Sequence, residues 1–398
     1  MARAPAARRA PPPRRRTLSW RSPRTRALAY QLLALAVVGF LGWLLVSNTL
    51  TNMRLRGIQS GFDFLAQPAG FDIGEGWVPY DSSDPYWKAF LVGVVNTLRV
   101  AVVGIVLTTV LGTLLGVGRF SPNALLRGLC YFYVETFRNI PVLLQLLMWY
   151  LLFTEYLPLP ADALRVGHLF FLSKNGLSFP ALAWEPGHWL ALGGLAMGCA
   201  AGFGWARFAQ TRFARTGRPV PVASVVLFLI VLLTWLGWLA GGSPAKFELP
   251  EIGELQVEGG AALSPEYLAV LIGLVLYTSA FVAEVVRAGI ASVALGQHEA
   301  SASLGLSRTR SMRLVVLPQA LRLIIPPLTS QYLNLTKNSS LAVAIGYPDV
   351  VSISNTALNQ SGRAVECIAI IMAVYLTMSL ATSALMNWFN KRAALRER

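Results

Sequence analysis

The sequence predicts an all-α polytopic membrane protein with about eight transmembrane helices. Two observations support this fold class. Of the 398 residues, 55% are hydrophobic and 13% are charged, whereas a soluble domain carries about 25% charged residues. In addition, apolar runs of about 18 residues or more, which are long enough to cross a bilayer, recur along the chain.

The predicted spans alternate with polar segments. In order, they cover about 27–46, 89–117, 129–153, 189–206, 220–240, 267–290, 318–340 and 366–388. The first lacks a clear small-residue cleavage site, so we interpret it as a span rather than as a signal peptide. In the second, Gly112 and Gly116 have the spacing that lets two helices approach closely.

The connecting segments differ in charge. Residues 1–26 contain nine arginines and no acidic residue; this composition cannot form a core, and we expect disorder. The other basic segments are 119–127, 207–218, 291–318 and 391–398. Because basic loops stay on the cytoplasmic side, both termini are predicted to be cytoplasmic. The net charge of +15 thus indicates orientation, and no nucleic-acid partner is predicted.

The remaining segments are predicted to face the outside and are mostly acidic. Residues 48–88 are also rich in Phe, Tyr and Trp, which favour the membrane–water boundary, so we expect this segment to be anchored at the outer interface. His168 and His188 lack partners at ligand spacing, and the three cysteines are far apart in the sequence. No metal site and no disulfide framework are therefore predicted.

A short polar and basic stretch over 296–318 lies between two predicted spans. Helix formers from 297 to 304 predict a short helix, and Gly305 can take the left-handed conformation that ends it. Ser307 can cap a second helix, which runs toward Pro318. The predicted result is a helix–turn–helix knuckle at a membrane face.

This stretch resembles the EAA loop of ABC-importer permeases. The family pattern is Glu-Ala-Ala, three residues, Gly, nine residues and Ile-x-Leu-Pro. Here the corresponding positions are Glu299, Ala300, Ser301, Gly305, Val315, Leu317 and Pro318, with two conservative departures, Ser301 for Ala and Val315 for Ile. In that family the loop is the coupling helix that docks in a groove of the ATPase subunit, which is helix-in-groove recognition.

The resemblance assigns the knuckle a role in ATPase coupling. Small Ala300 and Ser301 are expected to allow close approach of the partner, and Glu299 to meet a basic group on it. The candidate coupling residues are Gln297, Glu299, Ala300, Ser301, Gly305, Leu306, Leu317 and Pro318.

Several polar side chains fall inside the predicted spans, where charges usually pair or face a cavity. Glu135 and Arg138 are three residues apart and share a helix face, as do Glu284 and Arg287. An ion pair that only stabilises packing is the alternative for the first of these pairs. Pro141 can bend the third span.

The seventh span is predicted to be broken by Pro326 and Pro327, and broken helices often form substrate sites. Lys337 follows in the same span, with snorkelling to the interface as its alternative role. An amino acid needs one anion-binding and one cation-binding group. The candidate substrate path is therefore Glu135, Arg138, Gln145, Glu284, Lys337, Asn338 and Ser339.

A wider resemblance covers nearly the whole chain after residue 26. Glu135, Arg138-Asn-x-Pro and Gln145 are similar to polar amino-acid ABC permeases. The motifs beginning at Asn48, Arg56, Gly61 and Ala69 look like those of one permease subunit of general L-amino acid (glutamate/glutamine/aspartate/asparagine) importers. The resemblance implies a five-helix type I ABC-importer permease core made from the second, third, sixth, seventh and eighth spans.

The same resemblance implies the partners and the location. It predicts a bacterial inner-membrane protein with a cytoplasmic ABC ATPase dimer, a periplasmic amino-acid-binding protein and an L-amino acid substrate. It also predicts a second homologous permease, in a heterodimer rather than a homodimer. ATP and Mg are expected on the ATPase subunit, and no cofactor is expected on this chain.

The predicted organisation has six parts. They are a disordered basic cytoplasmic N-terminus (1–26), a first helix with a periplasmic segment (27–88), the first part of the core (89–153), an inserted helical hairpin with periplasmic loops (154–263), the second part of the core (264–390) and a cytoplasmic tail (391–398).

No pattern for catalysis is present in the sequence. Gly-Lys does not occur, so the phosphate loop GxxxxGK[ST] is missing, and the chain is not predicted to be an enzyme.

The predicted function is alternating-access import of polar L-amino acids. An ion-coupled secondary amino-acid transporter, with Lys337, Glu284 and Glu135 as relay groups, is the alternative, but it has no reason to keep the EAA spacing. A membrane receptor that binds ligand at 48–88 lacks a soluble signalling domain.

Overall fold

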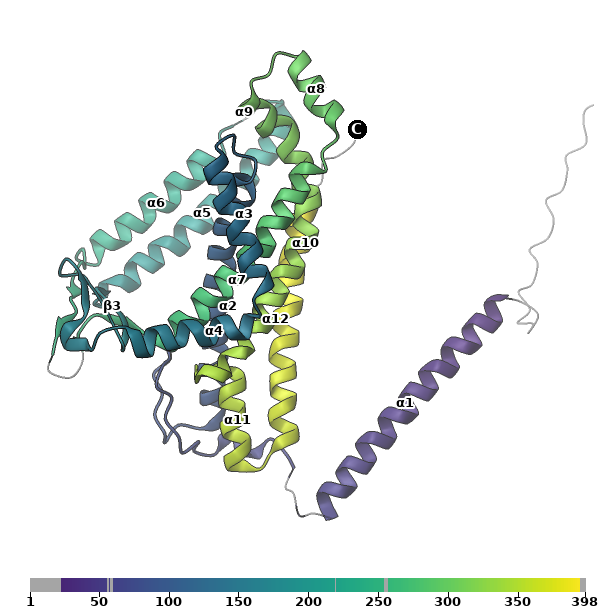
Figure 1. Ribbon diagram of the computed structural model, residues 1–398, viewed down its shortest axis with the longest axis vertical. Coiled ribbons are helices and arrows are strands. Elements are labelled where there is room, and N and C mark those ends of the chain that lie inside the picture. Colours follow the sequence, from purple (N-terminus) through teal and green to yellow (C-terminus); the bar gives the residue numbers. More distant parts are fainter. Residues whose placement is uncertain (1–22, 56, 58–59, 219, 254–256, 394–398) are drawn as a thin grey trace, which may run out of the picture.

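The computed structural model describes residues 23–55, 57, 60–218, 220–253 and 257–393, and it is mostly helical, as predicted (Figure 1). The long helices are α1 (Pro23–Leu55), α2 (Tyr86–Gly118), α3 (Ala124–Asn139), α4 (Val142–Leu151), α5 (Gly187–Thr216), α6 (Ala223–Ala240), α7 (Pro265–Ala291), α10 (Leu317–Asn338) and α12 (Ala364–Ala393). The short helices are α8 (Leu295–Ser303), α9 (Arg308–Ser311) and α11 (Val350–Ser361). Most of the N-terminus predicted to be disordered lies outside the described residues.

All eight predicted spans contain helix. Within the described residues, seven helices are long and apolar enough to cross a membrane, and the number is eight if the bent pair of α3 with α4 is one span. The predicted bend of the third span at Pro141 is confirmed, since α3 and α4 meet at 102°. The bend follows from Pro141, which precedes α4 and holds Ile140 in an extended conformation.

The prediction that Pro326 and Pro327 break the seventh span is wrong. Both prolines lie inside α10, which continues to Asn338. Helices tolerate proline within membranes where neighbouring helices enclose the disturbed backbone, and α10 packs against both α7 and α12. The chain leaves the α-helical path later, in a 3₁₀ turn over Ser339–Ile345 that ends at Gly346.

α2 and α7 form the most extensive pairing in the core, and small residues make it possible. A Cβ atom on Gly112 would lie 2.6 Å from Val282 Cβ and 2.9 Å from the Ser279 carbonyl oxygen. A Cβ on Gly116 would lie 2.7 Å from the Ala283 carbonyl oxygen. The predicted close-approach role of this glycine pair is confirmed.

We expect Gly112→Val to destabilise the protein, because the added side chain pushes α2 away from α7. Overpacking of this kind costs about 1–3 kcal/mol. Thermal unfolding of the purified protein measures the effect. Gly193→Val in α5 is the matched control, since a Cβ there meets no atom within 4 Å. Equal melting temperatures for the two variants would contradict the packing role of Gly112.

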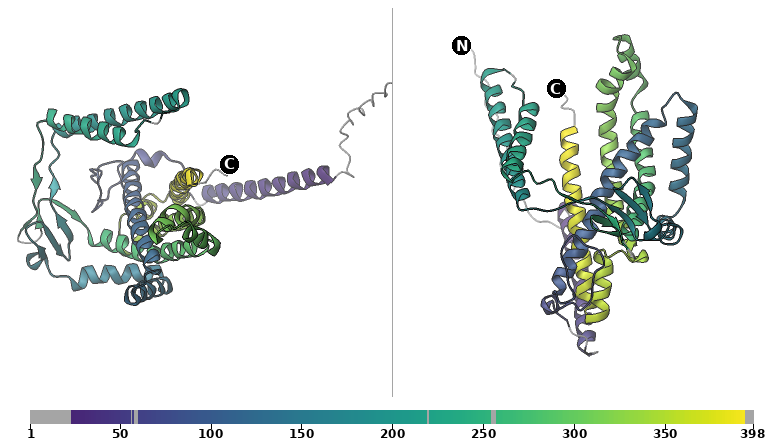
Figure 2. Two further views of the ribbon diagram at one scale, coloured as in Figure 1. Left: turned by 90° about the horizontal axis from the view of Figure 1, so that it is seen from above. Right: turned by 90° about the vertical axis from the view of Figure 1, so that its left-hand side faces the viewer.

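α5 and α6 pack along each other as a hairpin that leans away from the core helices (Figures 1 and 2). A four-stranded antiparallel sheet in the order β1 (Leu164–Val166), β2 (Phe170–Ser173), β3 (Gly176–Phe179) and β8 (Ala261–Leu263) joins the hairpin to the core. Two smaller pairs accompany the sheet: β4 (Ala181–Leu182) with β5 (Phe247–Glu248), and β6 (Glu251–Ile252) with β7 (Val257–Glu258). Loops were predicted here, and the eight strands were not.

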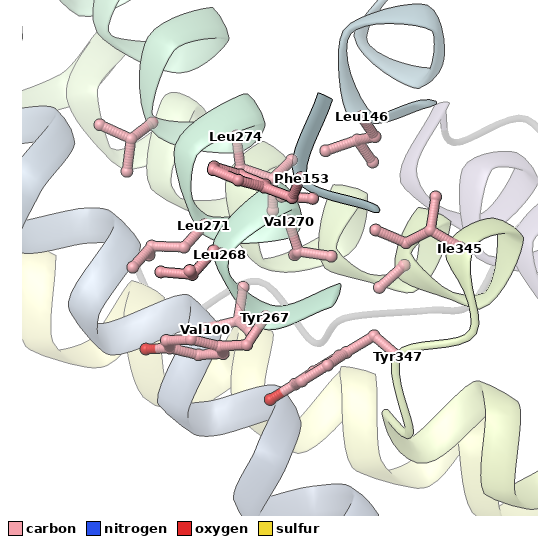
Figure 3. Packing of buried hydrophobic residues seen from close by; sticks show 13 residues of the cluster. Val100, Leu146, Phe153, Tyr267, Leu268, Val270, Leu271, Leu274, Ile345 and Tyr347 are labelled. Carbon is pink, nitrogen blue, oxygen red and sulfur yellow. The ribbon is translucent and has the colours of Figure 1, made fainter. Parts of the chain in front are cut away.

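The most buried helix is α7, whose first half is surrounded by α2, α4 and the 3₁₀ turn after α10. Figure 3 shows Val100, Leu146, Phe153 and Ile345 around the α7 side chains from Tyr267 to Leu274. Burial of this apolar surface fixes the ends of α4 and α10 relative to α7. By contrast, the most apolar stretch of α1 is unburied, and α1 extends away from the other helices (Figure 1).

The segment between α1 and α2 is part of the core rather than only an interfacial anchor. Phe64, in a short 3₁₀ turn over Asp63–Ala66, is 1% exposed and packs against Tyr86 and Phe90. Trp77 remains 70% exposed, as an interfacial aromatic would be. The expectation of interfacial anchoring is thus wrong for Phe64 and Tyr86, because α2 and α11 cover them.

Candidate functional site

The knuckle between α7 and α10 is a compact helix–turn–helix. α8 ends in a Schellman motif: Gly305 has φ of +70°, its N–H donates to the Ala302 carbonyl oxygen at 2.9 Å, and the Leu306 N–H donates to the Ser301 carbonyl oxygen at 3.2 Å. Ser307 then caps α9 by accepting from the Arg310 N–H. The predicted turn and cap are confirmed, and both follow from local chemistry.

Ser301 lies inside the knuckle rather than on its surface. It is 3% exposed, its hydroxyl donates to the His298 carbonyl oxygen at 2.8 Å, and it lies 2.6 Å from the Ser311 hydroxyl. This bond links α8 to α9 directly. The expectation that Ser301 allows close approach of a partner is therefore wrong, because the side chain stabilises the turn from within.

The outward surface of the knuckle combines small, charged and apolar groups. Glu299 and Ala300 are exposed, as a docking surface requires. Leu295 and Leu304, at the two ends of α8, are 71% and 79% exposed. These two leucines were not among the predicted coupling residues, although apolar side chains in an otherwise polar loop were a visible signal. We define the docking surface as Leu295, Glu299, Ala300 and Leu304.

The knuckle is attached to α10 without a break. A π-helical turn over Met312–Val316 joins α9 to Leu317, where α10 begins. Pro318 lies in the first turn of α10, directly after this π-helical turn, and supplies no backbone N–H to the helix. In addition, the Gln319 amide donates to the Gln297 side-chain oxygen at 3.0 Å. α8 is therefore tied to α10 by this hydrogen bond as well as through the continuous chain.

The seven residues of the predicted substrate path do not converge on one site, and within the described residues no ion pair joins any two of them. The Arg138 guanidinium lies 5.4 Å from the Phe281 ring centre and forms no ion pair with Glu135. The packing ion pair considered for Glu135 and Arg138 is thus not formed.

Gln145 and Glu284 have structural partners. Gln145 is 1% exposed and donates to the carbonyl oxygens of Phe137 and Ile140 at 3.0 and 2.9 Å, which holds the bend between α3 and α4. Glu284 accepts from Arg119 and Arg287, both at 2.5 Å. The predicted relation of Glu284 to Arg287 is confirmed, and Arg119 is an additional partner.

Lys337, Asn338 and Ser339 lie where α10 ends and the 3₁₀ turn begins. Lys337 is exposed and lines a cavity of about 320 Å³ together with Ser340, Val351, Ile371 and Tyr375. Ser339 is 1% exposed and donates to the Thr336 carbonyl oxygen at 2.7 Å. The helix break that was expected at the prolines therefore occurs beside Lys337.

A buried ion pair at the opposite end of the core from the knuckle was missed. Arg99 of α2 donates to Glu75 at 2.7 Å, and their side chains are 4% and 14% exposed. The Arg99 guanidinium lies 3.9 Å from the Tyr267 ring centre and 4.8 Å from that of Trp77. Glu75 also accepts from the Ser264 hydroxyl, which caps α7. A charged residue in the apolar run of α2 was the signal that could have indicated this pair.

The chain matches the family described as "Binding-protein-dependent transport system inner membrane component" over residues 190–395. It is 45% identical to the general L-amino acid transport system permease protein AapQ of Rhizobium johnstonii, with 94% of each chain covered. It is 46% identical to the putative amino-acid ABC transporter permease protein YhdX of Escherichia coli K12, with 96% of this chain and 98% of that protein covered.

A third relative is the glutamate/glutamine/aspartate/asparagine transport system permease protein BztB of Rhodobacter capsulatus. It is 37% identical, with 94% of this chain and 95% of that protein covered. These matches extend over nearly the whole chain, including the segment between α1 and α2 and the α5–α6 hairpin. The chain therefore belongs to the permease subunits of binding-protein-dependent ABC amino-acid transporters, in the general L-amino acid and glutamate–glutamine group.

Proposed function

We propose that this inner-membrane permease imports polar L-amino acids by alternating access and is driven by a separate ATPase that docks on the knuckle. The observation that carries the proposal is the knuckle itself. Its docking surface presents two exposed leucines beside Glu299 and Ala300, and its inner face is bonded through Ser301 and Gln297 to α9 and α10. Helix-in-groove recognition needs this combination of apolar anchors and a rigid helix.

The partners follow from the family and remain part of the proposal. They are a cytoplasmic ABC ATPase dimer, which holds ATP and Mg, a periplasmic amino-acid-binding protein, and a second homologous permease in a heterodimer. No cofactor is assigned to this chain. The six-part organisation stated above, with the core in 89–153 and 264–390, is proposed on the same basis.

The proposed orientation places both termini in the cytoplasm. α8 and α9, the start of α3, the turn between α5 and α6 and the end of α12 all lie toward one end of the structure (Figures 1 and 2). Each is basic or adjoins a basic segment, which favours the cytoplasmic side. The segment between α1 and α2, which contains Glu75 of the Glu75–Arg99 pair, lies at the opposite end and would face the periplasm. We call it the outer segment.

For the substrate path we propose the region where α10 ends. Lys337, Asn338 and Ser339 lie at the end of α10, where the chain passes into the 3₁₀ turn, and Lys337 supplies a cation for a substrate carboxylate. Glu135, Arg138, Gln145 and Glu284 are retained as further candidates along the route.

We expect Lys337→Ala to raise the KM for uptake roughly tenfold, because a charge-assisted hydrogen bond to a carboxylate contributes about 1.5–3 kcal/mol. Transport kinetics in proteoliposomes measure the change. The outward-facing Lys246→Ala is the control, since Lys246 is 81% exposed and lies near the α5–α6 hairpin. Unchanged kinetics for the alanine variants of Lys337, Asn338 and Ser339 would remove these residues from the path.

The proposed function is tested by purification in detergent followed by an ATPase assay with and without amino-acid-loaded binding protein. We expect a second permease and an ATPase to co-purify, and loaded binding protein to stimulate hydrolysis. The amino acid that stimulates hydrolysis identifies the substrate. A chain that purifies alone and moves amino acids in liposomes under an ion gradient would support the ion-coupled carrier instead.

A further inference from the structure

Three arginines line a cavity at the knuckle end of the core, where α2 ends, α3 begins and α7 ends. The cavity has a volume of about 400 Å³. Its lining consists of Arg119, Phe120, Ala124, Arg127, Gly128, Tyr131 and Arg287. The transport mechanism proposed above uses none of these residues.

The cavity carries more positive charge than its neighbours neutralise. Glu284 is the one carboxylate paired there among the described residues, and it is shared between Arg119 and Arg287. Arg127 donates to the Ser121 carbonyl oxygen at 3.0 Å and has no carboxylate within ion-pair distance. Two guanidinium charges are thus left over, and guanidinium groups bind phosphate oxygens through paired hydrogen bonds.

The surroundings of the cavity favour a lipid over a soluble anion. Leu125, Leu129 and Phe132 on α3 are 72%, 57% and 69% exposed. They lie on α3, the helix that also contributes Ala124, Arg127, Gly128 and Tyr131 to the cavity, so an acyl chain can cover them next to the head group. The Arg119 guanidinium also lies 5.3 Å from the Tyr131 ring centre, so the aromatic ring and the cation form one wall.

We propose that this cavity binds the phosphate of an anionic phospholipid in the cytoplasmic leaflet, with the acyl chains lying along α3. The inference rests on the orientation proposed above, and it adds a lipid site that import itself does not require. Basic pockets between membrane helices on the cytoplasmic side are suited to anionic head groups. The bound lipid would hold α3 against α2 and α7, close to the knuckle.

Two variants remove the site without breaking the Glu284 cluster. Arg127→Gln removes the arginine that has no acidic partner. Gly128→Leu fills the cavity, since a Cβ at Gly128 meets no atom within 4 Å, and Leu favours a helix more than Gly does. The matched controls are Arg212→Gln in the α5–α6 hairpin and Gly193→Leu in α5.

Native mass spectrometry of the purified permease, with its co-purifying subunits, measures binding of added phosphatidylglycerol, phosphatidylcholine or inorganic phosphate. We expect phosphatidylglycerol to bind more tightly than phosphatidylcholine. Arg127→Gln should weaken phosphatidylglycerol binding about fivefold, and Gly128→Leu should weaken it at least as much. The two controls should leave binding unchanged.

Equal phosphatidylglycerol binding by wild type and both variants would overturn the proposal. Inorganic phosphate that binds the cavity as tightly as the lipid would overturn the lipid source. Loss of the ATPase from Arg127→Gln with unchanged lipid binding would assign the cavity to the ATPase interface. Lipid binding is measured on the permease itself, so an absent ATPase would contradict the proposed function and leave this inference standing.

Discussion

Glu299→Lys should abolish coupled uptake while leaving the permease inserted in the membrane. Glu299 is exposed on α8 and has no ion-pair partner among the described residues, so the folded chain does not depend on it. If a basic group of the ATPase meets this carboxylate, a lysine there places like charges together, which costs several kcal/mol at an interface. We therefore expect uptake and stimulated ATP hydrolysis to fall at least roughly tenfold.

The control for this charge change is Gln210→Lys in the exposed end of α5. It adds positive charge on the same side of the membrane but outside the knuckle. Uptake, stimulated hydrolysis and the amount of ATPase that co-purifies should match wild type in the control. Wild-type uptake by Glu299→Lys would contradict the coupling role of α8.

Among the variants proposed here, Arg99→Ala should lower the free energy of unfolding most. Removing one partner of a buried ion pair leaves the other charge uncompensated and costs about 3–5 kcal/mol. The loss should detach the outer segment from α2 and α7, because Glu75 is also bonded to the cap of α7 through Ser264. The melting temperature of the purified protein measures the effect.

Two comparisons separate this buried pair from ordinary surface charge. Lys88→Ala breaks the Lys88–Asp84 pair, whose side chains are 27% and 25% exposed, and should cost at most about 1 kcal/mol. Replacing both buried partners, Glu75→Leu with Arg99→Met, should recover most of the stability lost in Arg99→Ala. Equal losses for Arg99→Ala and Lys88→Ala would contradict the role of the buried pair.

The features that the sequence predicted well are those fixed by local chemistry. The helix spans follow from apolar length, and the knuckle follows from a glycine that takes positive φ and a serine that caps the next helix. The close packing of α2 follows from Gly112 and Gly116, although the sequence did not identify α7 as the partner helix. Each of these depends on residues that are near one another in the chain or on a repeated spacing.

The features that the sequence did not predict depend on residues far apart in the chain. Arg99 pairs with Glu75 across 24 positions, and β3 pairs with β8 across the whole α5–α6 hairpin. The proline pair in α10 was misjudged, since α7 and α12 support the helix from outside. Likewise, Gln145 has a side chain of the kind that can bind an amino acid. In the structure, the 102° bend between α3 and α4 places its amide against the backbone carbonyl groups of Phe137 and Ile140.

The most direct test of the central claim is cross-linking from the docking surface. Leu304→Cys, in a background where the exposed native Cys199 is replaced by Ser, should cross-link to the ATPase subunit when the complex is treated with a short reagent that carries one thiol-reactive and one photoreactive group. Gln210→Cys should not. A Leu304→Cys complex that hydrolyses ATP in response to loaded binding protein, yet gives no cross-link to the ATPase, would contradict coupling through the knuckle.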